Sequence, residues 1–207
     1  KKDYAQAEIV QLIKPSDKRC TPFCKHFGTC GGCKWQQVKY VHQLEFKQQI
    51  VEEAFLRIGK MELPNIEPIL GCEETTFYRN KLEFTFSDRA WLTREQIDSG
   101  ASFNKNALGF HVAGNFASVL QIEECFLQDE RVNTIRNAIY QFVIEHQYSF
   151  YNLKFHEGLM RNLIFRTTTL EEWMVTVCFA APEMDKIEAL MTFIKANFPF
   201  ITSLNYI

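Results

Sequence analysis

The stretch YRNKLEFTF at residues 78–86 decides the fold class, because its side chains alternate in character along the chain. One face of an extended segment would carry Tyr78, Leu82, Phe84 and Phe86, and the other would carry Arg79, Lys81, Glu83 and Thr85. Alternation of this kind is typical of a strand that is buried on one side and solvated on the other. The sequence therefore predicts a half-buried strand here.

Segments on both sides extend this strand into an α+β domain. Further strands are predicted at residues 5–13, 107–112, 116–122, 151–156, 161–168, 173–180 and 200–206. Apolar residues three and four positions apart predict helices at 40–58, 129–147 and 183–197. Strands in runs, with helices between the runs, indicate a mostly antiparallel sheet with flanking helices.

Composition is that of a packed domain without a membrane segment. The chain has 207 residues, of which 46% are hydrophobic, and its formal net charge is −2. This length supports one well-packed domain. No run of about 18 apolar residues could span a bilayer, and the first residues do not resemble a signal peptide, so we expect a cytoplasmic protein without a membrane partner.

A cysteine-rich loop, CKHFGTCGGC at residues 24–33, is the strongest chemical signal in the chain. Seven cysteines without a secretory signal favour metal binding or buried thiols over a disulfide scaffold. Cys24, Cys30 and Cys33 have the spacing C-x5-C-x2-C, and the glycines between them let the backbone bend around an inorganic group. A fourth ligand must come from elsewhere, and Cys125, at the end of a predicted strand, is the candidate.

The spacing alone leaves three alternatives open: an iron–sulfur cluster, a zinc ion with four thiolates, and unbound thiols. Zinc sites usually use two C-x2-C pairs, whereas only one is present, so a cluster is favoured. Adding Cys20 gives a spacing that differs from the C-x3-C-x2-C of radical enzymes. Cys178, inside a predicted strand, is expected to be a buried and inert thiol.

A few polar and aromatic residues are candidates for contact with RNA. Arg79, Asn80 and Lys81 put basic and amide groups at one strand, which suits phosphate and sugar contacts. Arg161 is a weaker candidate, and Trp35 could stack on a base, although packing over the cysteine loop also explains it. A solvated sheet face is the alternative interpretation of the basic strand.

The segment CKHFGTCGGCKWQ resembles the RNA (uracil-5-)-methyltransferases, specifically the iron–sulfur branch that modifies 23S ribosomal RNA. Three further segments agree in order and spacing: FYRNKLEFTF at 77–86, ALGFHVAGNFASVLQIEECFL at 107–127 and EGLMRNLIFR at 157–166. The resemblance implies that Cys24, Cys30, Cys33 and Cys125 hold a [4Fe–4S] cluster. It also implies an RNA substrate, 5-methyluridine as the product and S-adenosylmethionine as the methyl donor.

The same resemblance implies a division of the chain into parts of a larger enzyme. Residues 1–19 would be the remnant of a TRAM-like β-barrel, 20–42 the iron–sulfur loop, 43–75 a helix and linker that pack on a methyltransferase domain, and 76–207 the central α+β domain. The domain that binds S-adenosylmethionine and carries the catalytic cysteine and glutamate would follow residue 207. We therefore expect no catalytic residue in this chain, and we expect the chain alone to be inactive.

Two further expectations concern partners. Without the methyltransferase domain, the helix within residues 43–58 would expose an apolar face. We expect either self-association through this helix or disorder around residues 43–75. The alternative function is a stand-alone RNA- or ribosome-binding protein that carries an iron–sulfur cluster or zinc and performs no catalysis. An electron-transfer iron–sulfur protein is a third hypothesis, and it predicts reversible reduction without affinity for RNA.

Overall fold

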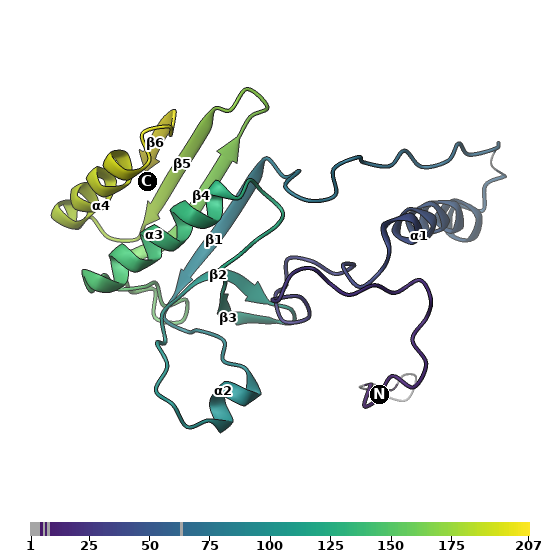
Figure 1. Cartoon of the computed structure of the whole chain (residues 1–207), viewed down its shortest axis with the longest axis horizontal. Helices are drawn as coiled ribbons and strands as arrows, with labels where there is room; N and C mark the ends of the chain where they lie inside the picture. Colours follow the sequence, from purple (N-terminus) through teal and green to yellow (C-terminus); the bar gives the residue numbers. More distant parts are fainter. Residues whose placement is uncertain (1–4, 6, 8, 63) are drawn as a thin grey trace. The chain divides into compact units, whose positions relative to one another are not determined.

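The computed structural model describes the chain apart from residues 1–4, 6, 8 and 63. The chain divides into two compact units (Figure 1). Unit 1 consists of residues 1–23 and 35–71, and unit 2 consists of residues 24–34 and 72–207. The cysteine loop thus belongs to the same unit as the predicted sheet.

Unit 2 is built on a six-stranded sheet with the strand order β3-β2-β1-β4-β5-β6. The strands are Lys81–Ser87 (β1), Ala107–Val112 (β2), Asn115–Gln121 (β3), Met160–Thr167 (β4), Trp173–Phe179 (β5) and Ser203–Tyr206 (β6). Every neighbouring pair is antiparallel except β5 and β6, which run parallel. Together with its flanking helices, this sheet confirms the predicted fold class.

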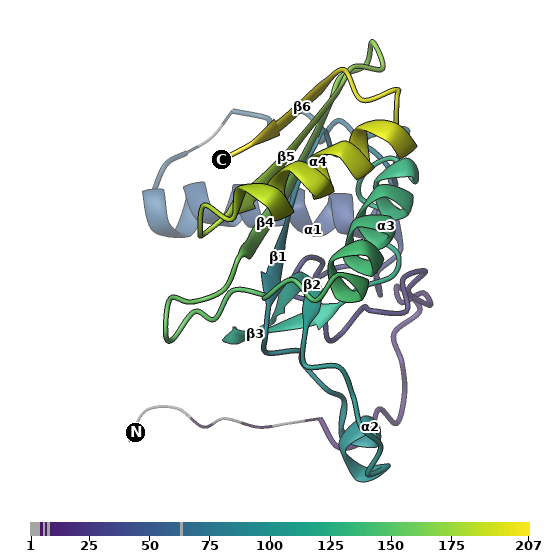
Figure 2. The same cartoon turned by 90° about the vertical axis from the view of Figure 1, so that its left-hand side faces the viewer.

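Two helices, α3 (Arg131–Glu145) and α4 (Met184–Asn197), cover one face of the sheet (Figure 2). Their apolar stripes are fully buried, as the periodicity predicts: Ile135 and Ile139 from α3, Leu190 and Ile194 from α4. These side chains pack on the apolar face of the strands, whose fully buried members include Phe84, Leu163, Phe165, Val175 and Val177. Burial of each such side chain stabilises the fold by about 1.5–3 kcal/mol.

The opposite face of the sheet carries polar residues, and no helix of unit 2 covers it. We call it the open face and define it by Lys81, Glu83 and Thr85 of β1, Asn162, Ile164 and Arg166 of β4, and Thr176 of β5. The register places Lys81 opposite Arg166, and Thr85 opposite Asn162. The alternation of residues 81–86 is therefore confirmed, whereas Tyr78 lies before the strand and is exposed.

Two predicted strands are wrong. The described residues among 5–13 form no strand, because no described strand lies beside them to pair with their backbone. The side chains of Ile9 and Val10 are exposed. Residues 151–156 form a turn instead. The side-chain oxygen of Asn152 accepts from the backbone N–H groups of Lys154 and Phe155, and this local bonding displaces the extended conformation.

One short helix, α2 (Arg94–Asp98), was not predicted. It lies in the connection between β1 and β2, and a capping box starts it. The Thr93 hydroxyl accepts from the Gln96 N–H, and the Gln96 side chain accepts from the Thr93 N–H. The sequence Thr-x-x-Gln is the signal that would have revealed this helix start.

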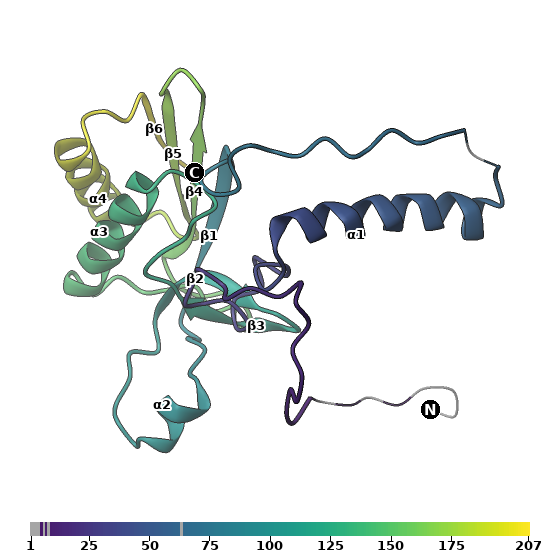
Figure 3. The ribbon, with the colours of Figure 1, turned by 45° about the vertical axis from the view of Figure 1, so that its right-hand side comes forward.

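Unit 1 is dominated by helix α1 (Tyr40–Glu53), which continues as a π-helical turn at Ala54–Gly59 (Figure 3). Together they confirm the predicted helix at 40–58. The helix ends at Lys60, whose backbone is left-handed (φ 50°). None of the residues of α1 is buried. Among the described residues, no helix combines the length and apolar character that crossing a bilayer takes.

Candidate cluster site and nucleic-acid interface

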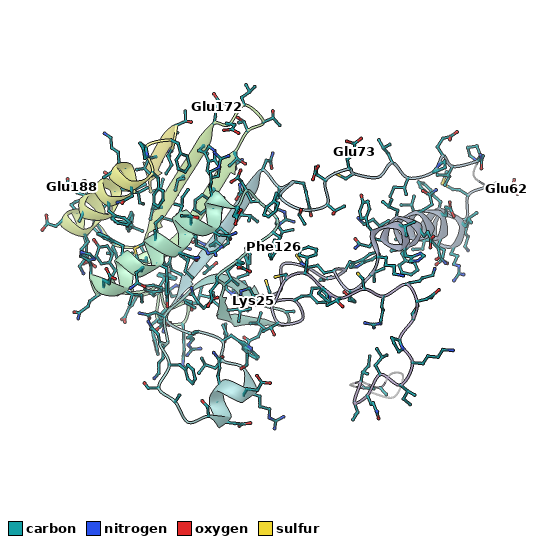
Figure 4. The ribbon with its side chains drawn as sticks, viewed as in Figure 1. Lys25, Glu62, Glu73, Phe126, Glu172 and Glu188 are labelled. Atoms are coloured by element: carbon teal, nitrogen blue, oxygen red, sulfur yellow. The ribbon has the colours of Figure 1, made fainter. Side chains whose placement is uncertain are left out.

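The cysteine loop is attached to β2 and to the segment that follows β3. On one side, the N–H of Gly31 donates to the carbonyl of His111 at 3.1 Å. On the other side, the N–H of Glu123 donates to Nε2 of His26 at 3.3 Å, and Lys25 forms an ion pair with Glu123. Figure 4 shows Lys25 on the loop and Phe126 on the segment that follows β3. These contacts bring the loop to the segment that carries Cys125.

The approach of the loop to β2 depends on a glycine. A Cβ atom added to Gly31 would lie 2.7 Å from the carbonyl oxygen of His111, which is closer than carbon and oxygen atoms pack. Gly32 has more room, since its added Cβ would meet the Sγ of Cys30 at 3.5 Å. Glycine is therefore required at the first position to let the backbone of the loop dock on the strand.

The four predicted ligand thiols interact with one another. Burial raises the pKa of Cys30 to about 11, and the N–H of Gly32, which donates to its Sγ at 3.4 Å, acts in the opposite direction. The charges of Cys125, Cys33 and Cys24 raise this pKa further, so these thiols lie within electrostatic range of Cys30. Burial also raises the pKa of Cys125, against a hydrogen bond from the N–H of Leu127 and the charge of Arg136.

Two residues of α3 hold Cys125 in place. The side-chain oxygen of Asn133 accepts from the N–H of Cys125 at 2.8 Å, and its amide nitrogen donates to the carbonyl of Cys125 at 3.2 Å. Arg136, which is fully buried, donates to the Asn133 side chain at 2.9 Å and to the carbonyl of Glu123 at 2.6 Å. Both the backbone of Cys125 and the segment before it are therefore tied to α3.

Arg136 is a buried cation whose hydrogen bonds all go to neutral oxygens. Its third acceptor is the Asn137 side-chain oxygen at 3.0 Å, and no carboxylate of the described residues lies within ion-pair distance. Its Nε has no hydrogen-bond partner in that part of the chain. Burial lowers the pKa of Arg136 to about 10, against the charges of Cys125 and Glu123, so the guanidinium stays protonated at neutral pH.

Sequence reasoning missed Asn133 and Arg136. The signal for Arg136 was its position on the apolar stripe of α3, between Ile135 and Ile139, where a charged residue needs a partner.

Within the part of the chain that the structure describes, no three His, Cys, Asp or Glu side chains converge closely enough to hold a single metal ion.

The remaining three cysteines, Cys20, Cys72 and Cys178, are not among the predicted ligands. All seven cysteines are free of disulfides. Cys178 is buried in β5, as predicted. The exposed Cys20 donates to the carbonyl of Gln36 at 3.3 Å, and the exposed Cys72 donates to that of Glu74 at 3.0 Å.

Three of the candidate RNA-contact residues lie at the start of β1. The backbone N–H of Arg79 donates to the carbonyl of Leu127 at 2.7 Å, and the carbonyl of Asn80 accepts from the N–H of Thr167 at 2.9 Å. The side chains of Arg79 and Asn80 are exposed. Lys81 is also exposed, 3.5 Å from Glu83. Sequence reasoning missed Arg166, which the register places opposite Lys81.

The other two candidates have different surroundings. Arg161 is exposed, with its guanidinium 5.1 Å from the ring centre of Tyr151. Trp35 belongs to unit 1, where its ring packs edge-on against Phe46 of α1 with centroids 6.2 Å apart. Packing within unit 1 thus accounts for Trp35.

No family model matches the sequence. The chain is 50% identical, over 211 aligned positions, to a Bacteroides thetaiotaomicron protein named an uncharacterized RNA methyltransferase, and 43% identical over 213 positions to a Porphyromonas gingivalis protein of the same name. Each alignment covers 100% of this chain and 46% of the relative, so the chain spans about half the length of the curated relatives it matches.

The fold is also found in a solved structure, the Pyrococcus abyssi tRNA (uracil-54, C5)-methyltransferase in complex with S-adenosyl-L-homocysteine. The superposition has a TM-score of 0.60 and covers 87% of this chain and 37% of that one, at 20% sequence identity. Along its whole length, the chain is thus homologous to a part of proteins named RNA methyltransferases, and it has a fold that occurs in an RNA methyltransferase of known structure.

Proposed function

We propose that this chain is part of an S-adenosylmethionine-dependent RNA methyltransferase that forms 5-methyluridine, with 23S ribosomal RNA as the substrate. Similarity along the entire chain to proteins named RNA methyltransferases carries this proposal. The complex of the structural neighbour with S-adenosyl-L-homocysteine, the product of methyl transfer, supports S-adenosylmethionine as the donor. Methyl transfer and donor binding would then belong to the part of the complete protein that lies outside this chain.

We further propose that Cys24, Cys30, Cys33 and Cys125 hold a [4Fe–4S] cluster. The chemistry of the donor set supports this group, because all four side chains are thiols and two of them accept backbone N–H bonds, from Gly32 and Leu127. Bonds of this kind to ligand sulfurs are a feature of iron–sulfur sites. Gly31 supplies the close backbone approach that a compact loop needs.

Buried charge gives an independent argument for a negatively charged group at this site. A guanidinium without a counter-ion in a protein interior costs several kcal/mol. Arg136 is such a group, and besides the exposed Glu123 the ionisable side chain that acts on it is Cys125, one of the four proposed ligands. A cluster with four thiolate ligands would offset the charge of Arg136.

The cluster would act as a structural link, because transfer of a methyl group to uracil consumes no electron. It would tie the loop at residues 24–34 to Cys125, which Asn133 and Arg136 connect to α3. The residues of this chain would then position the RNA, through Arg79, Asn80, Lys81 and Arg161, rather than perform the reaction.

The test is anaerobic purification of the chain and of two matched variants, followed by iron, sulfide and zinc analysis. Cys125 and Cys178 are equally buried, each 8% exposed, so Cys178→Ser is the control for Cys125→Ser. We expect Cys125→Ser to lose iron, to lose absorbance at about 400 nm and to melt at a lower temperature, whereas Cys178→Ser keeps its iron. One zinc per chain, or an unchanged spectrum and melting curve in Cys125→Ser, would contradict the cluster.

Activity is tested on the complete protein. We expect it to transfer a methyl group from S-adenosylmethionine to a uracil of 23S ribosomal RNA, and we expect the 207-residue chain alone to transfer none. Transfer RNA is the second candidate substrate, favoured by the named activity of the structural neighbour. A complete protein that binds RNA but methylates neither substrate would instead be an RNA-binding iron–sulfur protein without catalysis.

A further inference from the structure

A cavity of about 390 Å³ opens at one end of the open face. Its walls come from β1, from the β2–β3 hairpin, from β4 and from the turn before β4. The lining residues are Glu83, Thr85, His111, Phe116, Tyr151, Leu153, Arg161 and Asn162. The volume falls within the range of small-ligand pockets, about 300–1,000 Å³.

Two of its walls are aromatic. The ring of Phe116 stacks on His111, with centroids 4.7 Å apart and planes 10° apart, and Phe116 is 74% exposed. On another wall, the guanidinium of Arg161 lies 5.1 Å from the ring centre of Tyr151. Flat π surfaces and a planar cation are the groups on which unpaired bases stack.

The polar lining suits the edge of a base. Glu83, Thr85 and Asn162 come from paired positions of β1 and β4 and supply carboxylate, hydroxyl and amide groups. Nδ1 of His111 is buried and has no hydrogen-bond partner among the described residues. A polar ligand in the cavity could give Nδ1 of His111 the hydrogen-bond partner that it lacks among the described residues.

A pair of basic residues lies farther along the same face. Lys81 and Arg166 are opposite each other, four positions along the strands from the pair of Thr85 and Asn162. At about 3.3 Å per residue, that separation is about 13 Å, or roughly two nucleotides of an extended strand. Lys81 and Arg166 can therefore contact phosphates while a neighbouring base enters the cavity.

We propose that the open face binds a short single-stranded segment of RNA, with one unstacked base in the cavity between Phe116 and Tyr151 and with phosphates against Lys81 and Arg166. This inference rests on the proposed RNA-directed function and adds a second base-recognition site to it, separate from the site of methyl transfer. A base in a duplex could not enter the cavity, so the site selects unpaired segments.

The test is fluorescence anisotropy of the anaerobically purified chain with a labelled oligouridylate and with an RNA duplex of equal length, over a series of salt concentrations. Phe116→Ala should weaken single-strand binding by roughly 5- to 100-fold without changing its salt dependence, because stacking is lost but no phosphate contact is. Lys81→Gln and Arg166→Gln should each lower the slope of log affinity against log salt by about 0.7.

The controls are Leu170→Ala, another highly exposed apolar residue, and Lys195→Gln in α4, on the covered side of the sheet. Both should bind RNA like the unmodified chain. If Phe116→Ala binds single strands as tightly as Leu170→Ala does, or if the duplex binds as well as the single strand, the cavity does not hold a base. Methyl transfer by the complete protein is measured separately and tests the proposed function. A protein that transfers no methyl group can therefore be distinguished from one whose cavity binds no base.

Discussion

Arg136 shows at the scale of a single residue how the fold prepares the candidate cluster site. Its guanidinium is buried 5.1 Å from the ring centre of Phe84, and it donates to Glu123 and Asn133, which flank Cys125 in the hydrogen-bond network. The hydrogen bonds satisfy the two terminal nitrogens, leave Nε without a partner among the described residues, and do not neutralise the charge. An anion nearby would offset this charge, and we propose that thiolates bound to the cluster supply it.

Loss of this charge should therefore affect the loaded and the unloaded protein differently. We expect Arg136→Met to destabilise the cluster-loaded protein by about 3–5 kcal/mol, as removal of one partner of a buried ion pair does. The unloaded protein, prepared by iron chelation, should lose clearly less, because its guanidinium has no anion to begin with. Denaturant unfolding of both forms measures the difference.

A second readout separates the electrostatic role of Arg136 from simple packing. The reduction potential of the cluster should become more negative in Arg136→Met, because a nearby positive charge favours the reduced form, whereas Arg136→Lys should stay near the original value. Equal losses of stability in both forms, with an unchanged potential, would show that Arg136 only packs.

Asp129 supplies a pH-dependent contribution to stability. Two hydrogen bonds from the Arg131 guanidinium, at 2.9 and 2.8 Å, hold the pKa of this carboxyl below its usual value. A carboxyl with a lowered pKa stabilises the folded state above its unfolded pKa, about 3.9, and this contribution disappears as pH falls through the folded pKa. We expect Asp129→Asn to cost at most about 1 kcal/mol at pH 7 and progressively less as pH falls below the unfolded pKa, about 3.9, measured by urea unfolding against Glu188→Gln as a control.

At the scale of elements, the docking of the cysteine loop on β2 is the contact that assembles the site. The loop has little regular structure of its own, and the strand provides a fixed acceptor, the carbonyl of His111. Because Gly31 approaches this carbonyl so closely, the position of Cys30 and Cys33 depends on a residue without a side chain.

Gly31→Ala should therefore displace the loop, whereas Gly32→Ala should be tolerated. The added methyl group at residue 31 would meet a backbone oxygen, and overpacking of this kind costs about 1–3 kcal/mol. We expect reduced iron content and faster hydrogen exchange of the residue-31 amide in Gly31→Ala, and near-normal values in Gly32→Ala. Equal iron content in both variants would contradict a role for this contact.

At the scale of the whole molecule, the unit that carries α1 leaves apolar side chains in water. Ile50, Val51, Phe55 and Leu56 are each 41–58% exposed, and no residue of α1 is buried. The chain spans about half the length of the relatives, and we propose that the remainder of such a protein covers this surface.

We therefore expect the isolated chain to self-associate through residues 43–58. Sedimentation velocity should show association that increases with concentration, and the double variant Ile50→Ser, Phe55→Ser should be monomeric. Lys47→Ser, on the same helix but at a charged position, is the control. A monomer at all concentrations, with the amides of α1 protected from exchange, would show that the helix is stable without a partner.

Local patterns in the sequence determined the elements that build unit 2. Alternation along residues 81–86, the turn around Gly114 with its positive φ of 76°, and the apolar stripe of α3 are properties of neighbouring residues, and they produced β1, the β2–β3 hairpin and the helix as predicted. The spacing of three cysteines within residues 24–33 likewise identified the candidate ligands, because it is a local property of one loop.

Contacts between distant residues decided the rest. The pairing of Lys81 with Arg166, the parallel placement of β6 and the burial of Arg136 beside Cys125 depend on strand register and helix packing, which join residues far apart in the chain. Periodicity identifies which face of an element is apolar but not which element it meets. The sequence by itself thus determined the candidate ligands and the alternating strand, while only the tertiary structure placed a buried cation beside the fourth cysteine and a cavity on the same sheet face as the basic pair.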